Sequence, residues 1–98
     1  MMSNLEIIEC LRVEVATVSR EIPNTTCFLF GSAAINALAA SDVDVLILCS
    51  GDEEAVTVRQ KLAGTCLHFP LHLLVVTQEE ERELNFIATQ SCRRIYPD

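Results

Sequence analysis

Apolar residues recur along the chain at two spacings, and each spacing predicts a different type of element. Between Leu5 and Ile22 they recur every three or four residues, which is the period of a helix with one buried face. Ser3 and Glu6 form a capping-box pattern at the start of that helix. Three other runs are short and almost continuously apolar, as in strands covered on both faces. These runs span 26–30, 42–49 and 71–76.

Helical patterns also separate and follow the three predicted strands. The stretch 32–40 is rich in alanine, and 53–63 has acidic residues in its first turn, with Asp52 as a predicted N-cap and Gly64 as a predicted end. Thr77 opens a final helix whose predicted buried stripe is Leu84, Ile87, Ala88 and Cys92. The order predicts one small α/β domain over 1–98, with three strands and four helices.

The charge balance restricts the classes of partner. Seven basic and fourteen acidic side chains give a net charge of −7, which disfavours direct binding to nucleic acid. No apolar run is long enough to span a bilayer, and the first residues lack a signal-peptide pattern, so a cytoplasmic location is expected. The five cysteines include no Cys-x-x-Cys pair and are interpreted as small buried side chains in a reducing compartment.

The candidate site residues gather at the end of the first predicted strand and at the start of the second. Asp42 and Asp44 share one face of the second strand, with Cα atoms about 6.5 to 7 Å apart at the rise of a strand. Two carboxylates at this spacing can bind a hard divalent cation such as Mg²⁺ or Mn²⁺. Gly31 and Ser32 follow the first strand, where a tight turn and free N–H groups can approach a phosphate.

In these residues the chain resembles the minimal nucleotidyltransferases of the DNA polymerase beta-like superfamily. The shared pattern is an apolar strand, Gly31-Ser32, about ten residues, and Asp42-Val43-Asp44 opening another apolar strand. The resemblance implies a mixed sheet, a nucleoside triphosphate such as ATP as substrate, and Asp42 and Asp44 as catalytic metal ligands. It also implies that Gly31 and Ser32 bind phosphate. It does not specify which molecule accepts the nucleotide.

Two departures from the family pattern leave a second interpretation open. The residues after Ser32 include neither the basic residue nor the second glycine of many relatives, and His72 stands where active members carry a third acid. His72 is therefore a candidate general base or ligand, and a structural histidine is the alternative. The alternative function is an inactive module that binds nucleotide or a helical, toxin-like partner. Because so short a chain leaves little room for an acceptor lobe, a homodimer or helical partner protein is expected.

Overall fold

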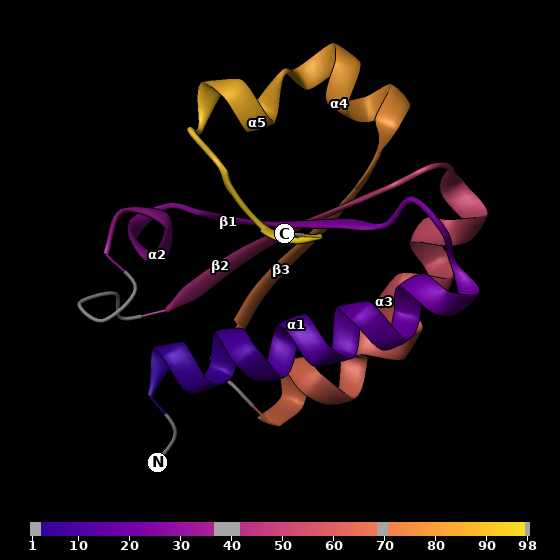
Figure 1. Cartoon of the computed structure of the whole chain (residues 1–98). Coiled ribbons are helices and arrows are strands. Elements are labelled where there is room, and N and C mark those ends of the chain that lie inside the picture. The colour runs from indigo at the N-terminus through magenta and orange to yellow at the C-terminus, as the bar shows by residue number, and fades with distance from the viewer. Residues whose placement is uncertain (1–2, 37–41, 69–70, 98) are drawn as a thin grey trace.

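The structure is a computed structural model, and it describes residues 3–36, 42–68 and 71–97. The predicted α/β class is confirmed, with a mixed sheet that has helices on both faces (Figure 1). In chain order the elements are α1 (Asn4–Glu21), β1 (Thr26–Phe30), α2 (Ser32–Ile35), β2 (Val43–Cys49), α3 (Asp52–His68), β3 (Leu71–Thr77), α4 (Gln78–Leu84), α5 (Phe86–Thr89) and β4 (Arg93–Tyr96).

The sheet contains both strand orientations, in the spatial order β3-β2-β1-β4. β1 pairs antiparallel with β2 on one side and with β4 on the other. β2 pairs parallel with β3, an arrangement that requires a long crossover, and α3 supplies it. Because β2 and β3 run in the same direction, their first residues meet at the same end of the sheet.

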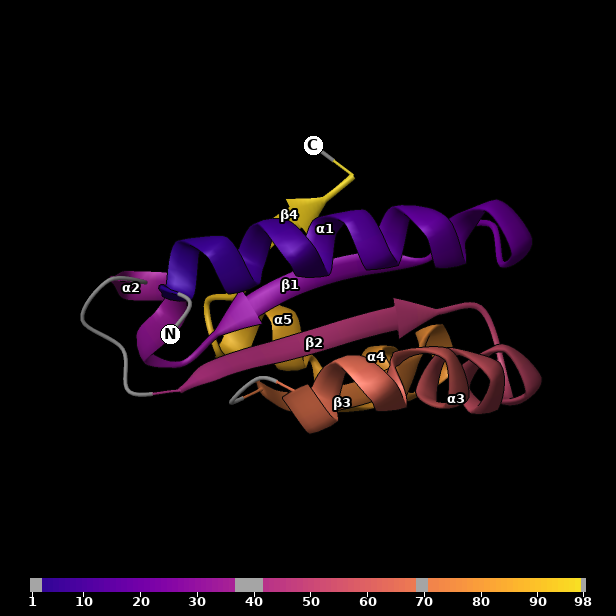
Figure 2. The same cartoon turned by 90° about the horizontal axis from the view of Figure 1, so that it is seen from below.

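One face of the sheet carries the main hydrophobic core. α1 and α3 lie side by side across this face, α1 near β1 and β4 and α3 near β3 (Figures 1 and 2). Alternate strand residues point into this layer, where they meet the apolar stripes of the two helices. The fully buried members include Leu11, Val15, Cys27, Val43, Val45, Ile47, Cys49, Val58 and Leu62.

The opposite face of the sheet, called the second face below, is covered by α4 and α5 (Figure 1). This cover is uneven. Leu46 on β2 and Val76 on β3 are buried, whereas Leu74 on β3 is 38 % exposed. The middle of the second face is therefore packed over β2, and its edge at β3 is open to solvent.

The predicted C-terminal helix begins at its predicted capping box but ends at Leu84, and the described residues form a sheet of four strands rather than three. Asn85 adopts a left-handed conformation (φ 50°) that ends α4. The Glu81 carboxylate accepts hydrogen bonds from the backbone N–H groups of Phe86 and Ile87, which holds the start of α5. Neither α4 nor α5 contains a buried residue, and the chain then returns as β4 to pair with β1.

Other helix boundaries also differ from those predicted. α3 begins at Asp52 and continues through Gly64, and α2 covers Ser32–Ile35, whereas 37–41 lie outside the described residues. The capping box of α1 is confirmed, but Leu5 is exposed and Ile7 takes its place in the core. None of the described helices is both long and apolar enough to cross a membrane.

Cys10, Cys27, Cys49 and Cys92 are free thiols; Cys27 and Cys49 are buried as predicted, whereas Cys10 and Cys92 are only partly buried. Burial raises the pKa of Cys27 to about 12, and burial likewise raises the pKa of the Cys49 and Cys92 thiols. These three side chains therefore stay protonated at neutral pH, which is the behaviour of small core residues rather than of nucleophiles.

Because the second face is covered unevenly, replacing Leu46 or Leu74 by alanine should lower the free energy of unfolding by different amounts. The two residues lie directly opposite each other on β2 and β3. Leu46→Ala should lower the free energy of unfolding by about 2–5 kcal/mol, because it leaves a cavity under α4. Leu74→Ala, the matched change at the half-exposed partner position, should cost about 1 kcal/mol or less. Urea denaturation of both variants measures the difference, and equal losses would mean that the face is covered evenly.

Candidate active site

The parallel register of β2 and β3 brings together three of the side chains singled out from the sequence. Asp44 lies directly opposite His72, near the first residue of each strand. Residues opposite each other in a ladder point to the same face, here the second face. Asp42 stands two residues before Asp44 and turns its carboxylate toward the same imidazole ring. Two carboxylates and one imidazole thus share one corner of the sheet.

His72 lies between the two carboxylates. Its Nδ1 is 3.0 Å from Asp44 Oδ1, and its Nε2 is 3.9 Å from Asp42 Oδ2. An ionised carboxylate can only accept a hydrogen bond, so Nδ1 is the donor to Asp44. In the neutral ring Nε2 then carries the free lone pair. The side chain of His72 is 68 % exposed, so that lone pair is accessible to a substrate hydroxyl.

Gly31 forms the other wall of the site. Its backbone has φ 65° and ψ −148°, a conformation open essentially to glycine alone. A Cβ atom at this position would lie 2.6 Å from Asp44 Oδ2. The first residue after β1 must therefore lack a side chain for the Asp44 carboxylate to keep its place. One oxygen of Asp44 faces His72 and the other faces the backbone of Gly31.

Ser32 follows Gly31 at the start of α2 and is exposed. Its hydroxyl makes no hydrogen bond to another described residue. α2 is a single turn over the described residues, so its dipole contributes little beyond the local N–H groups. Gly31 and Ser32 thus lie at the same end of the sheet as the two acids, with a hydroxyl free to contact a phosphate.

Carboxylates such as those of Asp42 and Asp44 are the side chains that could hold a hard divalent cation here. In the described part of the chain, no three or more His, Cys, Asp or Glu side chains are grouped so that they could hold a metal by themselves. Mg²⁺ commonly binds through one or two carboxylates and takes its remaining ligands from water and substrate phosphates. Asp42 and Asp44 are carboxylates of this type, and in this structure they flank the His72 imidazole at 3.9 and 3.0 Å.

The sequence did not indicate the aromatic neighbour of this site. Phe30 lies directly opposite Asp44 in the β1–β2 ladder, and its ring meets that of Phe86 edge to face, with centroids 5.1 Å apart. The alternation of Phe28 and Phe30 along β1 is the sequence signal that both rings share the second face. Phe86 could not be placed because its segment was predicted as the interior of a longer helix.

An open polar hollow of about 430 Å³ lies at the other end of the sheet. It is lined by residues where β1 begins and where α4 follows β3, among them Thr26 and Gln78. Ser19 and Tyr96, whose hydroxyls are 2.7 Å apart, form another part of its wall. Since the acids and His72 stand at the starts of β2 and β3, this hollow is not part of the candidate site.

Comparison of the chain with models of protein families, with curated proteins and with solved structures found no match.

The geometry of Gly31 predicts that even a methyl group disrupts the site. Gly31→Ala should lower the free energy of unfolding by about 1–3 kcal/mol, because it strains the backbone and displaces the Asp44 carboxylate. Gly64→Ala is the matched control: Gly64 lies within α3, nothing lies within 4 Å of the added Cβ, and about 1 kcal/mol of stabilisation is expected. Chemical denaturation of the two variants provides the measurement, and a neutral Gly31→Ala change would contradict the described packing.

Proposed function

We propose that this protein is a metal-dependent nucleotidyltransferase, similar to the minimal members of the DNA polymerase beta-like superfamily. One observation carries the proposal: two carboxylates and an imidazole gather at the starts of adjacent strands, against a glycine turn that excludes a side chain. The substrate class is a nucleoside triphosphate. The mixed orientation of the sheet, which the resemblance implied, gives independent support.

Asp42 and Asp44 would hold Mg²⁺ or Mn²⁺ in this proposal. When bound, the metal ion neutralises negative charge on the phosphates during transfer. Gly31 leaves room for the Asp44 carboxylate, and the exposed Ser32 hydroxyl beside it contacts an outer phosphate oxygen. Asp44 can serve both His72 and the cation because a carboxylate offers several lone pairs.

His72 would act as the general base. Asp44 fixes the orientation of the ring through Nδ1, and Nε2 takes the proton of the acceptor hydroxyl. The acceptor oxygen then bonds to the α-phosphorus, the bond between that phosphorus and the bridging oxygen breaks, and pyrophosphate leaves. The accessible Nε2 atom, rather than a third carboxylate, distinguishes this arrangement from the family pattern.

A second candidate function is a nucleotide-binding module that does not catalyse transfer. The observation that favours it is His72, which stands where the family pattern has a third acid. Its hydrogen bond to Asp44 Oδ1 leaves that oxygen less available to a cation. In either case we propose that a second copy of the chain or a helical partner protein completes the assembly. Ile35 on α2, four residues after Gly31 in the sequence, is 89 % exposed, so its apolar side chain is available to such a partner.

Ligand-induced stabilisation tests whether the acids form a nucleotide site. With Mg²⁺ and a triphosphate at 100 times the Kd, wild type should gain about 2.7 kcal/mol of stability, seen as a higher Tm. Asp44→Asn should abolish this gain because the cation loses a carboxylate. Asp52→Asn, the same charge change at the start of α3, should retain it. A wild-type protein whose Tm is unmoved by Mg²⁺ or Mn²⁺ with any of the four ribonucleotides would refute nucleotide binding.

Substitutions of His72 separate catalysis from positioning. His72→Ala should slow transfer by about 10²- to 10⁴-fold while the Kd of the triphosphate changes little. His72→Asn keeps an N–H donor for Asp44 but lacks a basic Nε2 atom, so it should be equally slow if His72 is the base. Pyrophosphate release and the mass of the protein and any co-purifying partner report transfer. Retained activity in His72→Asn would assign the residue to positioning, and no transfer by wild type would favour the binding module.

A further inference from the structure

The strand registers align a second row of side chains next to the one that contains the acids. The first row on the second face runs His72, Asp44, Phe30 across β3, β2 and β1. The next row runs across all four strands. Its members are Leu74, Leu46, Phe28 and Arg94. An arginine therefore ends the row directly adjoining the candidate site.

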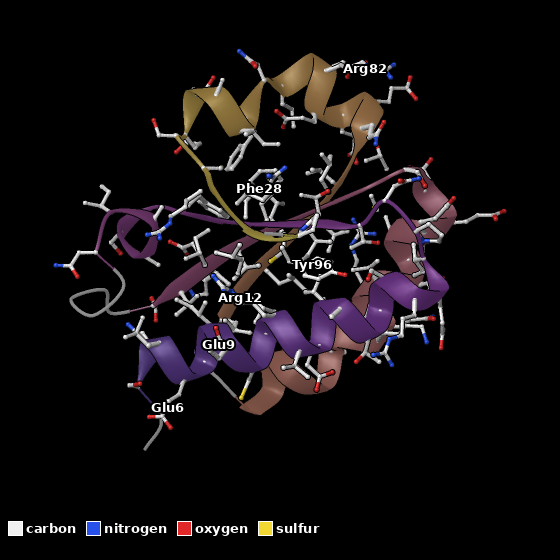
Figure 3. All side chains as sticks on the ribbon, viewed as in Figure 1. Glu6, Glu9, Arg12, Phe28, Arg82 and Tyr96 are labelled. Atoms are coloured by element: carbon white, nitrogen blue, oxygen red, sulfur yellow. The ribbon has the colours of Figure 1, made fainter. Side chains whose placement is uncertain are left out.

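Arg94 faces the same side of the sheet as Asp44. It pairs with Phe28, which Figure 3 shows on the side of the sheet that faces α4 and α5. The following residue, Ile95, is the extra residue at a register shift in the β1–β4 ladder, and it is buried in the core on the opposite face. The preceding residue, Arg93, pairs with the core residue Leu29 and so projects from the other side of β4.

The Arg94 guanidinium is exposed and forms no hydrogen bond or ion pair with another described residue. Arg12, Arg59 and Lys61 are engaged, whereas Arg20, Arg82 and Arg93, like Arg94, have no ion pair or side-chain hydrogen bond to another described residue. Lys61 pairs with Glu21 at 2.6 Å, and Arg59 donates to the Val75 carbonyl oxygen at the outer edge of β3. Arg94 thus presents an uncompensated positive charge on the face that carries the two acids.

The distance between Arg94 and Asp44 matches the length of an elongated anion such as a polyphosphate. Two strand spacings of about 4.8 Å and two residues of about 3.3 Å place the Cα atoms of Arg94 and Asp44 about 12 Å apart. An extended arginine side chain and a polyphosphate chain together span this distance. The Phe28 and Phe30 positions lie between them on β1, where the Phe86 ring of α5 packs edge to face against Phe30.

We propose that Arg94 binds the phosphates of the nucleoside triphosphate held at Asp42 and Asp44, an inference that rests on the proposed function. The two carboxylates repel a polyphosphate, and 33–36 beside the glycine turn offer no cation against it. A guanidinium supplies this charge and can bind two phosphate oxygens at once. β4 thereby supplies the cation that the segment 33–36, after Ser32, lacks.

A charged residue on an edge strand can also serve only to prevent association between sheets. Arg93 has the same charge, lies on the same edge strand and is also exposed, but it faces away from the acids. Arg93→Ala is therefore the matched control for Arg94→Ala. Arg94→Lys keeps the charge without the two-pronged geometry.

Titration calorimetry with Mg–ATP, Mg–GTP, Mg–CTP and Mg–UTP at an ionic strength of about 0.15 M, where the Debye length is about 8 Å, tests the proposal. For the triphosphate that wild type binds most tightly, Arg94→Ala should raise the Kd about tenfold or more, the effect of one charge-assisted contact. Arg93→Ala should change the Kd less than about twofold, since charge this remote from the phosphates is screened. Arg94→Lys should fall between wild type and Arg94→Ala. Added salt should weaken wild type more than Arg94→Ala.

The outcomes separate this inference from the proposed function. If wild type binds a triphosphate and the two alanine variants bind it equally, the role of Arg94 is refuted and the nucleotide site stands. If wild type binds none of the four, the proposed function fails and the role of Arg94 fails with it. Thermal melts without ligand show whether both alanine variants are folded, and Arg94→Lys provides the comparison if Arg94→Ala is not.

Discussion

The parallel pairing of β2 with β3 is the constraint on which the rest of this structure depends. Parallel neighbours cannot be joined by a tight turn, so the chain must cross over, and α3 makes that crossing while covering the core. Both strands then begin at the same end of the sheet. An antiparallel pairing of the same two segments would place Asp44 and His72 at opposite ends. The site therefore follows from strand direction as much as from residue identity.

The hydrophobic core fixes which face the site occupies. Val43 and Val45 are fully buried on the side of α1 and α3, so Asp44 between them must point to the second face. A register slip of one residue would drive its carboxylate into the core, at a cost of several kcal/mol. The energy that holds the fold together thus also orients the acids. Gly31 completes the arrangement, because its missing side chain leaves room for Asp44 Oδ2.

The parts of the fold dominated by local pattern could be predicted from the sequence. The three apolar runs became β1, β2 and β3 with boundaries shifted by no more than one residue, and the α/β class followed from their alternation with helices. Period-two alternation also placed Asp42 and Asp44 on one face. Their meeting with His72 could only be stated as a condition, since apolar runs do not encode the direction in which two strands pair.

Prediction failed where tertiary contacts override local preference. Gly64 disfavours a helix by about 1 kcal/mol, but α3 continues through it, and this cost is small beside the burial of Ala55, Val58 and Leu62 on the same helix. At the C-terminus, Leu84, Ala88 and Cys92 keep a spacing of four residues although the positive φ of Asn85 ends α4. β4 carries two adjacent arginines and gives no strand pattern of its own. Its pairing with β1 defines it.

That last error bears directly on the chemistry of the site. On a C-terminal helix, Arg93 and Arg94 would be two surface cations with no defined relation to the acids. As part of β4, they project to opposite sides of the sheet, and Arg94 joins the face that carries Asp44 and His72. A chain of net charge −7 with two carboxylates at its candidate site repels a polyphosphate unless some cation is held nearby. The antiparallel pairing of the last strand is what brings such a cation to this face, so the electrostatic balance of the site is set by topology.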